Sequence, residues 1–177
     1  PTPEMKEFMF NAKVGDDVFG EDEAINSLEK FAADMFGMEA AIFCPSGTMT
    51  NQIAIKVHTQ PGDEVICYES AHVYKYEGGG IAMNSGASTK LIKGDRGILS
   101  ASEIEANIRP DDIHFPRTSL VCLENTVNVG GGNCYNLSTI VDIKEVCNKY
   151  NLKLHLDGAR LFASLLKYDK NPKELAL

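Results

Sequence analysis

The sequence lacks the features of several classes of protein. It has no run of apolar residues long enough to cross a bilayer, and no signal peptide opens it, so we expect neither a membrane protein nor a secreted one. Positive charge is also scarce, because 17 Lys and Arg residues stand against 25 Asp and Glu residues, for a net charge of −8. A surface of this sign repels a phosphate backbone, and nucleic acid is therefore not an expected partner.

Metal and nucleotide motifs are missing as well. The five cysteines are an odd number with no C-x-x-C pair, which predicts neither a zinc site nor a disulfide framework. Cysteines of this kind fit a reducing, cytoplasmic setting, and no metal site is expected. The glycine-containing loops match neither a Walker loop nor the G-x-G-x-x-G pattern of dinucleotide-binding proteins.

The chain instead alternates segments typical of strands and of helices. Its 177 residues, 44% of them hydrophobic, are enough for one domain with a core. The expected strands are Ala40–Cys44, Glu64–Tyr68, Thr89–Ile92, Ser119–Leu123 and Lys153–Leu156. The expected helices are Glu23–Phe36, Thr48–His58, His72–Glu77, one that Ser100 caps and that reaches Ile108, and one from Ser138 to Tyr150. This alternation predicts an α/β fold of three layers, in which helices flank a mainly parallel sheet.

Polar clusters follow four of the expected strands. They are Pro45-Ser46-Gly47-Thr48, Ser70-Ala71-His72, Glu124-Asn125-Thr126 and Asp157. Open α/β sheets bind ligands beyond the carboxyl ends of their strands, so we expect these clusters to converge on one site. Two glycine triplets, at 78–80 and 130–132, are interpreted as turns that need a positive φ.

The sequence Asp157-Gly158-Ala159-Arg160 places a carboxylate at the end of the last expected strand. A buried acid needs a cationic partner, and a protonated pyridine nitrogen is one candidate. Arg160 could hold another anionic group nearby. The alternative is a structural ion pair between Asp157 and Arg160, which the i, i+3 spacing allows if a helix begins there.

Each of the other clusters also has two interpretations. Ser46-Gly47-Thr48 joins a strand to a helix, where free N–H groups could form a phosphate cup, or Ser46 could simply cap the helix. His72 could stack on a flat cofactor or transfer a proton, or it could be a hydrogen-bonded, half-buried residue. Glu124 and its neighbours could contact a ligand or cap the next turn.

Together these stretches resemble the threonine aldolases, which are pyridoxal 5′-phosphate (PLP)-dependent enzymes of fold type I. The resemblance covers nearly the whole chain. It rests on the stretches Val14–Asp22, Pro45–Met49, Asp112–Thr118, Glu124–Thr126 and His155–Phe162, which occur in the family's order. It implies that residues 1–177 form a single PLP-binding large domain of the PLP-dependent transferase type.

The resemblance also implies roles for individual residues. The loop Ser46-Gly47-Thr48-Met49 matches the one that binds the cofactor phosphate. His72 matches the histidine that stacks on the pyridine ring, and Asp157 matches the aspartate paired with the pyridine nitrogen. Arg160 matches the arginine near the substrate carboxylate. These residues are therefore the expected catalytic and cofactor-binding set.

The implied reaction is retro-aldol cleavage of β-hydroxy-α-amino acids such as threonine or allo-threonine to glycine and an aldehyde. Two alternatives stay open, a PLP-dependent β-eliminating lyase and a non-catalytic remnant of the fold. The family resemblance further implies a homo-oligomer, built as a dimer of dimers, with a small-molecule amino acid as its partner.

The chain departs from the family pattern in three places. Val127 stands where the family commonly has a histidine, and the serine of the family's Arg-Ser-Asp-Thr opening has no counterpart here. No lysine in the sequence has the Ser-Lys-Gly context of the residue that forms the Schiff base. We therefore expect a large domain that is incomplete at both ends, ends before that lysine and the C-terminal small domain, and has no activity by itself.

Overall fold

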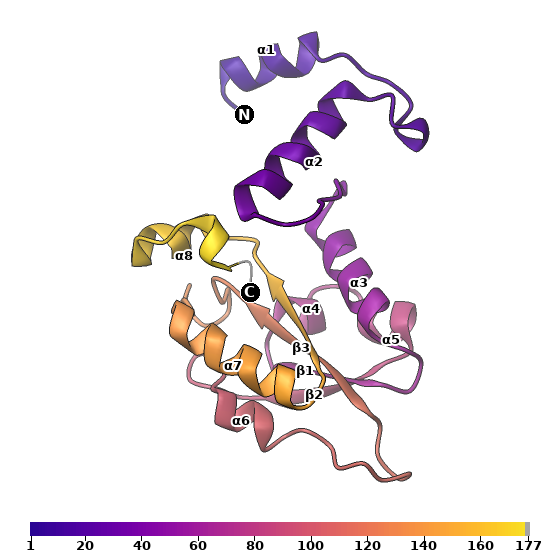
Figure 1. Ribbon diagram of the computed structural model, residues 1–177, viewed down its shortest axis with the longest axis vertical. Coiled ribbons are helices and arrows are strands. Elements are labelled where there is room, and N and C mark those ends of the chain that lie inside the picture. The colour runs from indigo at the N-terminus through magenta and orange to yellow at the C-terminus, as the bar shows by residue number, and fades with distance from the viewer. Residues whose placement is uncertain (176–177) are drawn as a thin grey trace. The chain divides into compact units, whose positions relative to one another are not determined.

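The computed structural model describes residues 1–175, which form two compact units (Figure 1). The first unit comprises residues 1–43 together with 172–175, and the second comprises Cys44–Asn171. In the first unit, the helices are α1 (Pro3–Asn11), η1 (Asp17–Phe19), α2 (Glu23–Phe36) and η2 (Pro172–Leu175). None of the helices within the described residues is both long and apolar enough to cross a membrane.

The second unit is built on a four-stranded parallel sheet in the order β2-β1-β3-β4. Its strands are β1 (Glu64–Tyr68), β2 (Ser88–Ile92), β3 (Thr118–Glu124) and β4 (Lys153–Asp157). The helices of this unit are α3 (Gly47–His58), α4 (His72–Lys75), α5 (Gly80–Ser85), α6 (Ala101–Glu105), α7 (Leu137–Lys149) and α8 (Leu161–Tyr168). The predicted α/β class and parallel sheet are therefore confirmed.

The sheet buries apolar side chains on both of its faces. The central strand β3 is buried along its whole length, as expected for a parallel strand covered on both sides. On one face, β1 and β3 pack with Ile55 of α3, Val73 of α4 and Ile81 of α5 in a single apolar cluster. Figure 1 shows α6 and α7 on the other face. This layering leaves the carboxyl ends of the strands as the edge where polar groups gather.

The four strands of the sheet agree with the sequence prediction to within one residue at each end. Helix α2 has its predicted bounds and ends at Gly37, whose φ of 68° is the left-handed conformation expected of a C-cap glycine. The capping box of Ser100 and Glu103 is also present. Gly78 and Gly79, like Gly131 and Gly132, have the positive φ expected of turns.

The helices expected to reach Glu77 and Ile108 end earlier, at Lys75 and Glu105. Two further local predictions are wrong. The first concerns Ala40–Cys44, which is not a strand. A strand needs a hydrogen-bonded neighbour, and none of the four strands pairs with this segment. Instead, the Phe43 N–H donates to Glu29 Oε1 at 2.7 Å. The second concerns α7, whose N-cap is Asn136 rather than Ser138. The Asn136 Oδ1 accepts the Thr139 N–H at 2.8 Å, so the helix begins one residue before Ser138.

An ion pair fixes the chain before the two central strands. Arg117 donates to both carboxylate oxygens of the buried Asp63, at 3.1 and 2.7 Å. The Arg117 hydrogen bond, assisted by the Gln60 N–H, lowers the pKa of Asp63 below its ordinary value of 3.8 although burial opposes the shift. A lowered pKa contributes stability above the unfolded value, and this contribution is lost as the pH falls through the folded value.

We therefore expect Asp63→Asn to reduce the free energy of unfolding by about 1 kcal/mol at neutral pH, since Arg117 is largely exposed and the pair is screened. The deficit should shrink from about pH 4 downward and disappear once the wild-type carboxyl is protonated. Urea unfolding of both proteins across this range measures it, with the exposed Asp142→Asn as control. A deficit of the same size at every pH would contradict the assignment.

Candidate active site

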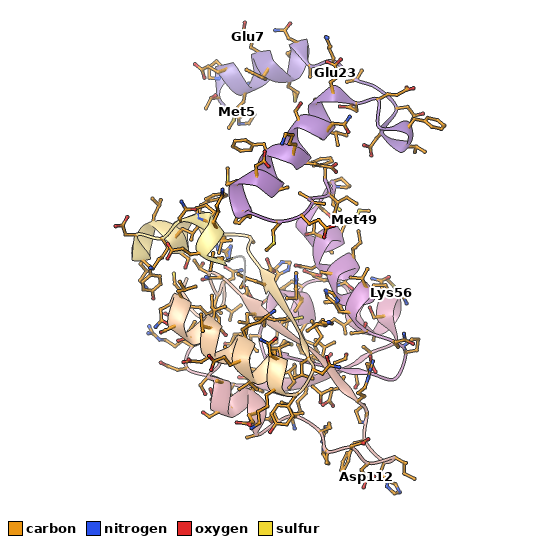
Figure 2. All side chains as sticks on the ribbon, in the orientation of Figure 1. Met5, Glu7, Glu23, Met49, Lys56 and Asp112 are labelled. Carbon is orange, nitrogen blue, oxygen red and sulfur yellow. The ribbon has the colours of Figure 1, made fainter. Side chains whose placement is uncertain are left out.

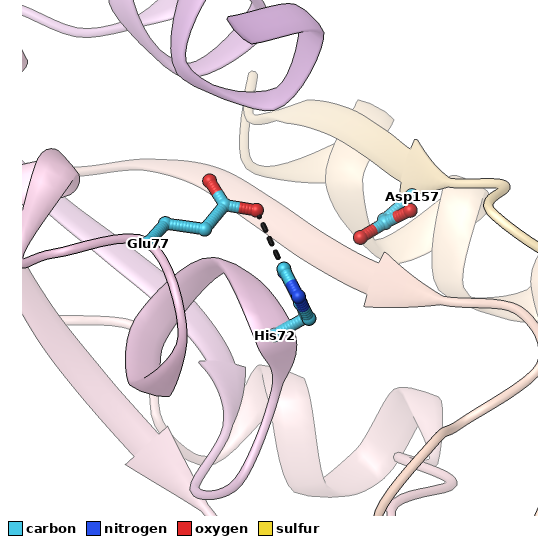
Figure 3. A group of neighbouring side chains, drawn as sticks. All are labelled: His72, Glu77 and Asp157. Carbon is cyan, nitrogen blue, oxygen red and sulfur yellow. Dashed lines mark hydrogen bonds and ion pairs between the residues drawn. The ribbon is translucent and has the colours of Figure 1, made fainter. Parts of the chain in front are cut away.

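His72 is held at the start of α4 by two acids. Its backbone N–H donates to Glu124 Oε2 at 3.0 Å, and its Nδ1 lies 2.9 Å from Glu77 Oε1 (Figure 3). Glu77 is buried, whereas the His72 side chain is 38% exposed. With Nδ1–H bonded to the carboxylate, Nε2 carries the lone pair, and within residues 1–175 that nitrogen has no hydrogen-bond partner. The imidazole is therefore fixed at one nitrogen and open at the other.

Asp157 ends β4 and lies in register with Glu124, the last residue of β3. Its carboxylate is buried, and Figure 3 shows it directed toward His72 and Glu77. The Ala159 N–H donates to Oδ1 at 3.1 Å, and the Asn51 side-chain amide donates to Oδ2 at 3.0 Å. The predicted convergence of the His72, Glu124 and Asp157 clusters is confirmed by these contacts.

The sequence did not predict three residues of this network, Asn51, Gln52 and Glu77. Asn51 Nδ2 donates to Glu77 Oε1 at 2.8 Å as well as to Asp157, and Gln52 Nε2 donates to Glu77 Oε2 at 2.6 Å. All three residues are buried. Asn51 and Gln52 lie on α3, one turn after the predicted phosphate cup, and this spacing is shared by any polar face of a helix.

The site carries more negative charge than its protein partners neutralise. Glu77, Glu124 and Asp157 are all buried, and within residues 1–175 none of them pairs with a Lys or Arg side chain; Glu77 has the His72 imidazole as a hydrogen-bond partner. A buried carboxylate that has hydrogen bonds but no counter-ion favours binding of a cation. The buried Asp157 carboxylate is therefore suited to bind a protonated pyridine nitrogen.

A metal ion would be a second kind of cation for this position. Ligand atoms of His72, Glu77 and Asp157 lie within 4.8 Å of one another. The carboxylates of Glu77 and Asp157 already accept hydrogen bonds from Asn51 and Gln52, which a bound ion would have to displace in part. The described groups are thus better prepared for a ligand that donates a single N–H to Asp157 than for a shared metal.

Glu124, whose place at a strand end allowed either a ligand contact or a cap, caps backbone groups in the structure. Its two oxygens accept the backbone N–H groups of His72 and Asn128, at 3.0 and 2.9 Å. The acid therefore caps two turns at once, which is the capping interpretation. The neighbouring Asn125 is buried and donates through Nδ2 to Ser164 Oγ at 3.0 Å.

Val127 is fully buried, so its side chain is not exposed to a ligand. It packs beside two loop glycines, because a Cβ added at Gly97 or at Gly130 would come against Val127 Cγ1. Where the family commonly has an imidazole, this protein thus has an apolar contact that closes the loop after β3. His72 is left as the imidazole that opens toward the site.

Arg160 does not form the structural ion pair with Asp157 that its spacing allowed. It is the N-cap of α8, it is exposed, and its Nε donates to Thr126 Oγ1 at 3.3 Å. Its terminal guanidinium nitrogens form no hydrogen bond within the described part of the chain. The guanidinium is therefore free to bind an anionic group close to the end of β4.

The predicted cofactor loop forms the first turn of α3. Ser46 is its N-cap, with Oγ accepting the Met49 N–H at 3.2 Å, so the capping interpretation holds and the phosphate cup stays a prediction. A Cβ at Gly47 would meet no atom within 4 Å, which leaves room for a ligand. Thr48 and Met49 are exposed, and Figure 2 shows Met49 on this turn of the helix.

A cavity of about 460 Å³ adjoins this loop. Its lining includes Ser46, Thr48, Met49 and Gln52, the last of which also holds Glu77. His72 and Asp157 do not line this cavity, so it meets the acidic site through Gln52 alone. The first turn of α3 thus has open space next to it and a polar connection to the buried carboxylates.

Comparisons with known proteins identify the family of the chain and its fold. The chain is 41% identical to the low specificity L-threonine aldolase of Escherichia coli O157:H7 over 176 residues, 99% of this chain and 52% of that protein. It is 43% identical to the probable low-specificity L-threonine aldolase 2 of Arabidopsis thaliana over 92% of this chain and 47% of that protein. The chain thus spans about half the length of the curated relatives that it matches.

A solved structure of threonine aldolase from Leishmania major superimposes with a TM-score of 0.84 at 26% identity, covering 98% of this chain and 50% of that one. Residues 1–176 of the sequence match the model of the beta-eliminating lyase family. The family match and the structural similarity agree, and the chain belongs to the beta-eliminating lyase family.

Proposed function

We propose that the protein containing this chain cleaves threonine or allo-threonine to glycine and acetaldehyde with bound PLP. The observation that carries the proposal is the buried Asp157 carboxylate, which within residues 1–175 has two hydrogen bonds and no counter-ion, next to an imidazole whose Nε2 has no partner there. A cationic ring nitrogen would neutralise the Asp157 carboxylate, and a substrate hydroxyl would donate a hydrogen bond to His72 Nε2. The identity to threonine aldolases supports the choice of substrate.

The described residues would hold the cofactor at its two ends. The first turn of α3, from Ser46 to Met49, would bind the phosphate through N–H groups and the Thr48 hydroxyl. Asp157 would bind the protonated pyridine nitrogen, and His72 would stack on the ring. When bound, PLP supplies an electron sink that stabilises negative charge on the α-carbon of an amino acid.

The protein's own groups then act on the substrate. Arg160 would bind the amino acid carboxylate through the terminal nitrogens that have no partner within residues 1–175. His72 Nε2 would accept the proton of the β-hydroxyl as the Cα–Cβ bond breaks, and Glu77 would stabilise the imidazolium that forms. The aldehyde leaves, and a proton returned to the α-carbon completes glycine.

Oligomeric state and location are part of the same proposal. The resemblance supports a dimer of dimers, and the odd number of cysteines without a C-x-x-C pair supports a reducing, cytoplasmic setting. Because the chain spans about half the length of its relatives, the activity is proposed for the whole protein. Sedimentation of the purified protein tests the oligomer directly.

The proposal is tested by incubating the PLP-loaded protein with threonine, allo-threonine, serine, cysteine and tryptophan side by side. Glycine and acetaldehyde from the first two support it. Ammonia and a keto acid from serine, cysteine or tryptophan would instead favour β-elimination. A protein that neither binds PLP nor converts any of the five would be the non-catalytic remnant.

The phosphate cup can be separated from the simple cap by a substitution at Thr48. Thr48 is exposed, and its hydroxyl makes no hydrogen bond within the described residues. If it binds the phosphate, Thr48→Ala should weaken PLP about tenfold, the usual value of one hydrogen bond to a charged group. Titration of the cofactor by absorbance measures this.

The control for this experiment is the cap residue itself. Ser46→Ala removes the cap and should lower stability by about 1 kcal/mol, whereas Thr48→Ala should leave the unfolding midpoint nearly unchanged. Unchanged PLP affinity in Thr48→Ala would show that the first turn of α3 is a cap and nothing more.

A further inference from the structure

We propose that Asn51 is a positioning residue for the candidate active site: its amide, oriented by His155, holds Asp157 and Glu77 in place together and thereby sets His72. The inference rests on the proposed function for its consequence but on the contacts of the described residues for its geometry. It concerns a residue on α3 that touches both acids and lies outside the predicted catalytic set.

Three contacts determine the orientation of the Asn51 amide. Nδ2 donates to Glu77 Oε1 at 2.8 Å and to Asp157 Oδ2 at 3.0 Å, which uses both of its hydrogens. Oδ1 lies 2.9 Å from His155 Nε2. If the amide were flipped, its oxygen would face two carboxylates and its NH₂ group would face the imidazole. Only the observed orientation of the amide therefore places its N–H groups opposite the carboxylates and its oxygen opposite the imidazole.

His155 can donate this hydrogen bond as a neutral imidazole. It is on β4, two residues before Asp157, and burial lowers its pKa, with His58 acting in the same direction and with Asp157 and Glu77 opposing it. A neutral ring has one N–H, and the contact with Asn51 requires it on Nε2. Strand β4 thus supplies both the acid and the group that aims the amide at it.

The network continues from the amide to the reactive imidazole. Glu77 Oε1 accepts hydrogen bonds from both the Asn51 amide and His72 Nδ1, while Oε2 accepts one from Gln52. A shift of the Asn51 amide therefore moves Asp157 and Glu77 together. One neutral side chain separates two carboxylates that would otherwise repel each other, and its N–H groups stabilise both charges.

The test compares the Asn51→Asp variant of the full-length protein with the wild type. The substitution keeps the size of the side chain, removes both N–H donors and adds a third negative charge beside Asp157 and Glu77. We expect at least tenfold weaker PLP binding, measured by absorbance. We also expect a rise in the pKa of His155, measured by ¹⁵N NMR of the histidine side chains in the cofactor-free protein.

A second pair of variants keeps the test decisive if Asn51→Asp fails to fold. His155→Gln retains an N–H donor near the position of Nε2, whereas His155→Phe removes it. His155→Gln should keep PLP affinity within about threefold, and His155→Phe should lose at least tenfold. A purely structural role would make the two variants behave alike. Asn148→Asp, at an exposed position of α7, is the matched control for the added charge.

The outcomes distinguish this inference from the proposed function. Folded Asn51→Asp with wild-type PLP affinity and unchanged ¹⁵N shifts of His72 and His155 would overturn the positioning role. Equal losses in His155→Gln and His155→Phe would do the same. Failure of the wild type to cleave threonine would contradict the proposed function alone, because the NMR shifts and the cofactor titration do not depend on turnover.

Discussion

Replacement of Asp157 by Asn is expected to lower kcat/KM for threonine cleavage by about 10³-fold, the upper range for removal of one preorganised electrostatic contact at a reacting centre. The new amide has nearly the same shape but no charge to hold a protonated ring nitrogen. It would also present an N–H group to the donors that now face the carboxylate, the Asn51 amide and the Ala159 N–H. Both effects weaken the same interaction with the cofactor.

The measurement combines steady-state kinetics with the absorption spectrum of bound PLP, because the loss should appear at saturating cofactor as well as below it. Asp111→Asn, at an exposed position of the loop before β3, is the control for removing one carboxylate. If Asp157→Asn retained activity within tenfold of the wild type, Asp157 would not be the partner of the ring nitrogen, and the proposed orientation of the cofactor would be wrong.

The second large effect is expected at Gly97, where Ala should lower the free energy of unfolding by about 3 kcal/mol. Two costs add at this position. The φ of Gly97 is +83°, which strains any L side chain, and an added Cβ would overlap Val127 Cγ1 and approach the Tyr68 ring within 3.0 Å. Tyr135 also donates to the Gly97 carbonyl, so the loop has little freedom to move.

A double-mutant comparison separates the two costs. Gly131 has a similar φ of +79° with no atom within 4 Å of an added Cβ, so Gly131→Ala reports backbone strain alone, about 1 kcal/mol. In a Val127→Ala background, the effect of Gly97→Ala should fall toward that smaller value, because the overlapping methyl group is gone. Denaturant unfolding measures the wild type and the four variants, and strictly additive effects of Gly97→Ala and Val127→Ala would refute the packing between Gly97 and Val127.

The sequence predicted the sheet well and the site in part, and the reason lies in which interactions are local. The strands β1 and β3 are short apolar runs, and a parallel sheet makes their carboxyl ends meet, so the convergence of His72, Glu124 and Asp157 could be predicted. Ala40–Cys44 has the same composition but forms no strand, because its pairing depends on a neighbour that composition does not specify.

The amides around the acids could not be predicted in the same way. Asn51 and Gln52 have the helical spacing of any polar face, and only the packing of α3 against the sheet brings them to Glu77 and Asp157. The helices α1, α5 and α8 were also missed, since each is short or depends on turn glycines such as Gly79. Local propensity is a weak guide where tertiary contacts decide.

The two acids that share the Asn51 amide differ greatly in how far along the chain they lie from it. Glu77 is 26 residues away and Asp157 is 106 residues away. During synthesis from the N-terminus, the amide can therefore meet Glu77 long before Asp157 has been made, and closing the longer loop costs more chain entropy. The half of the network that holds His72 can form first, and the carboxylate proposed to bind the cofactor joins it only after β4 has been added to the sheet.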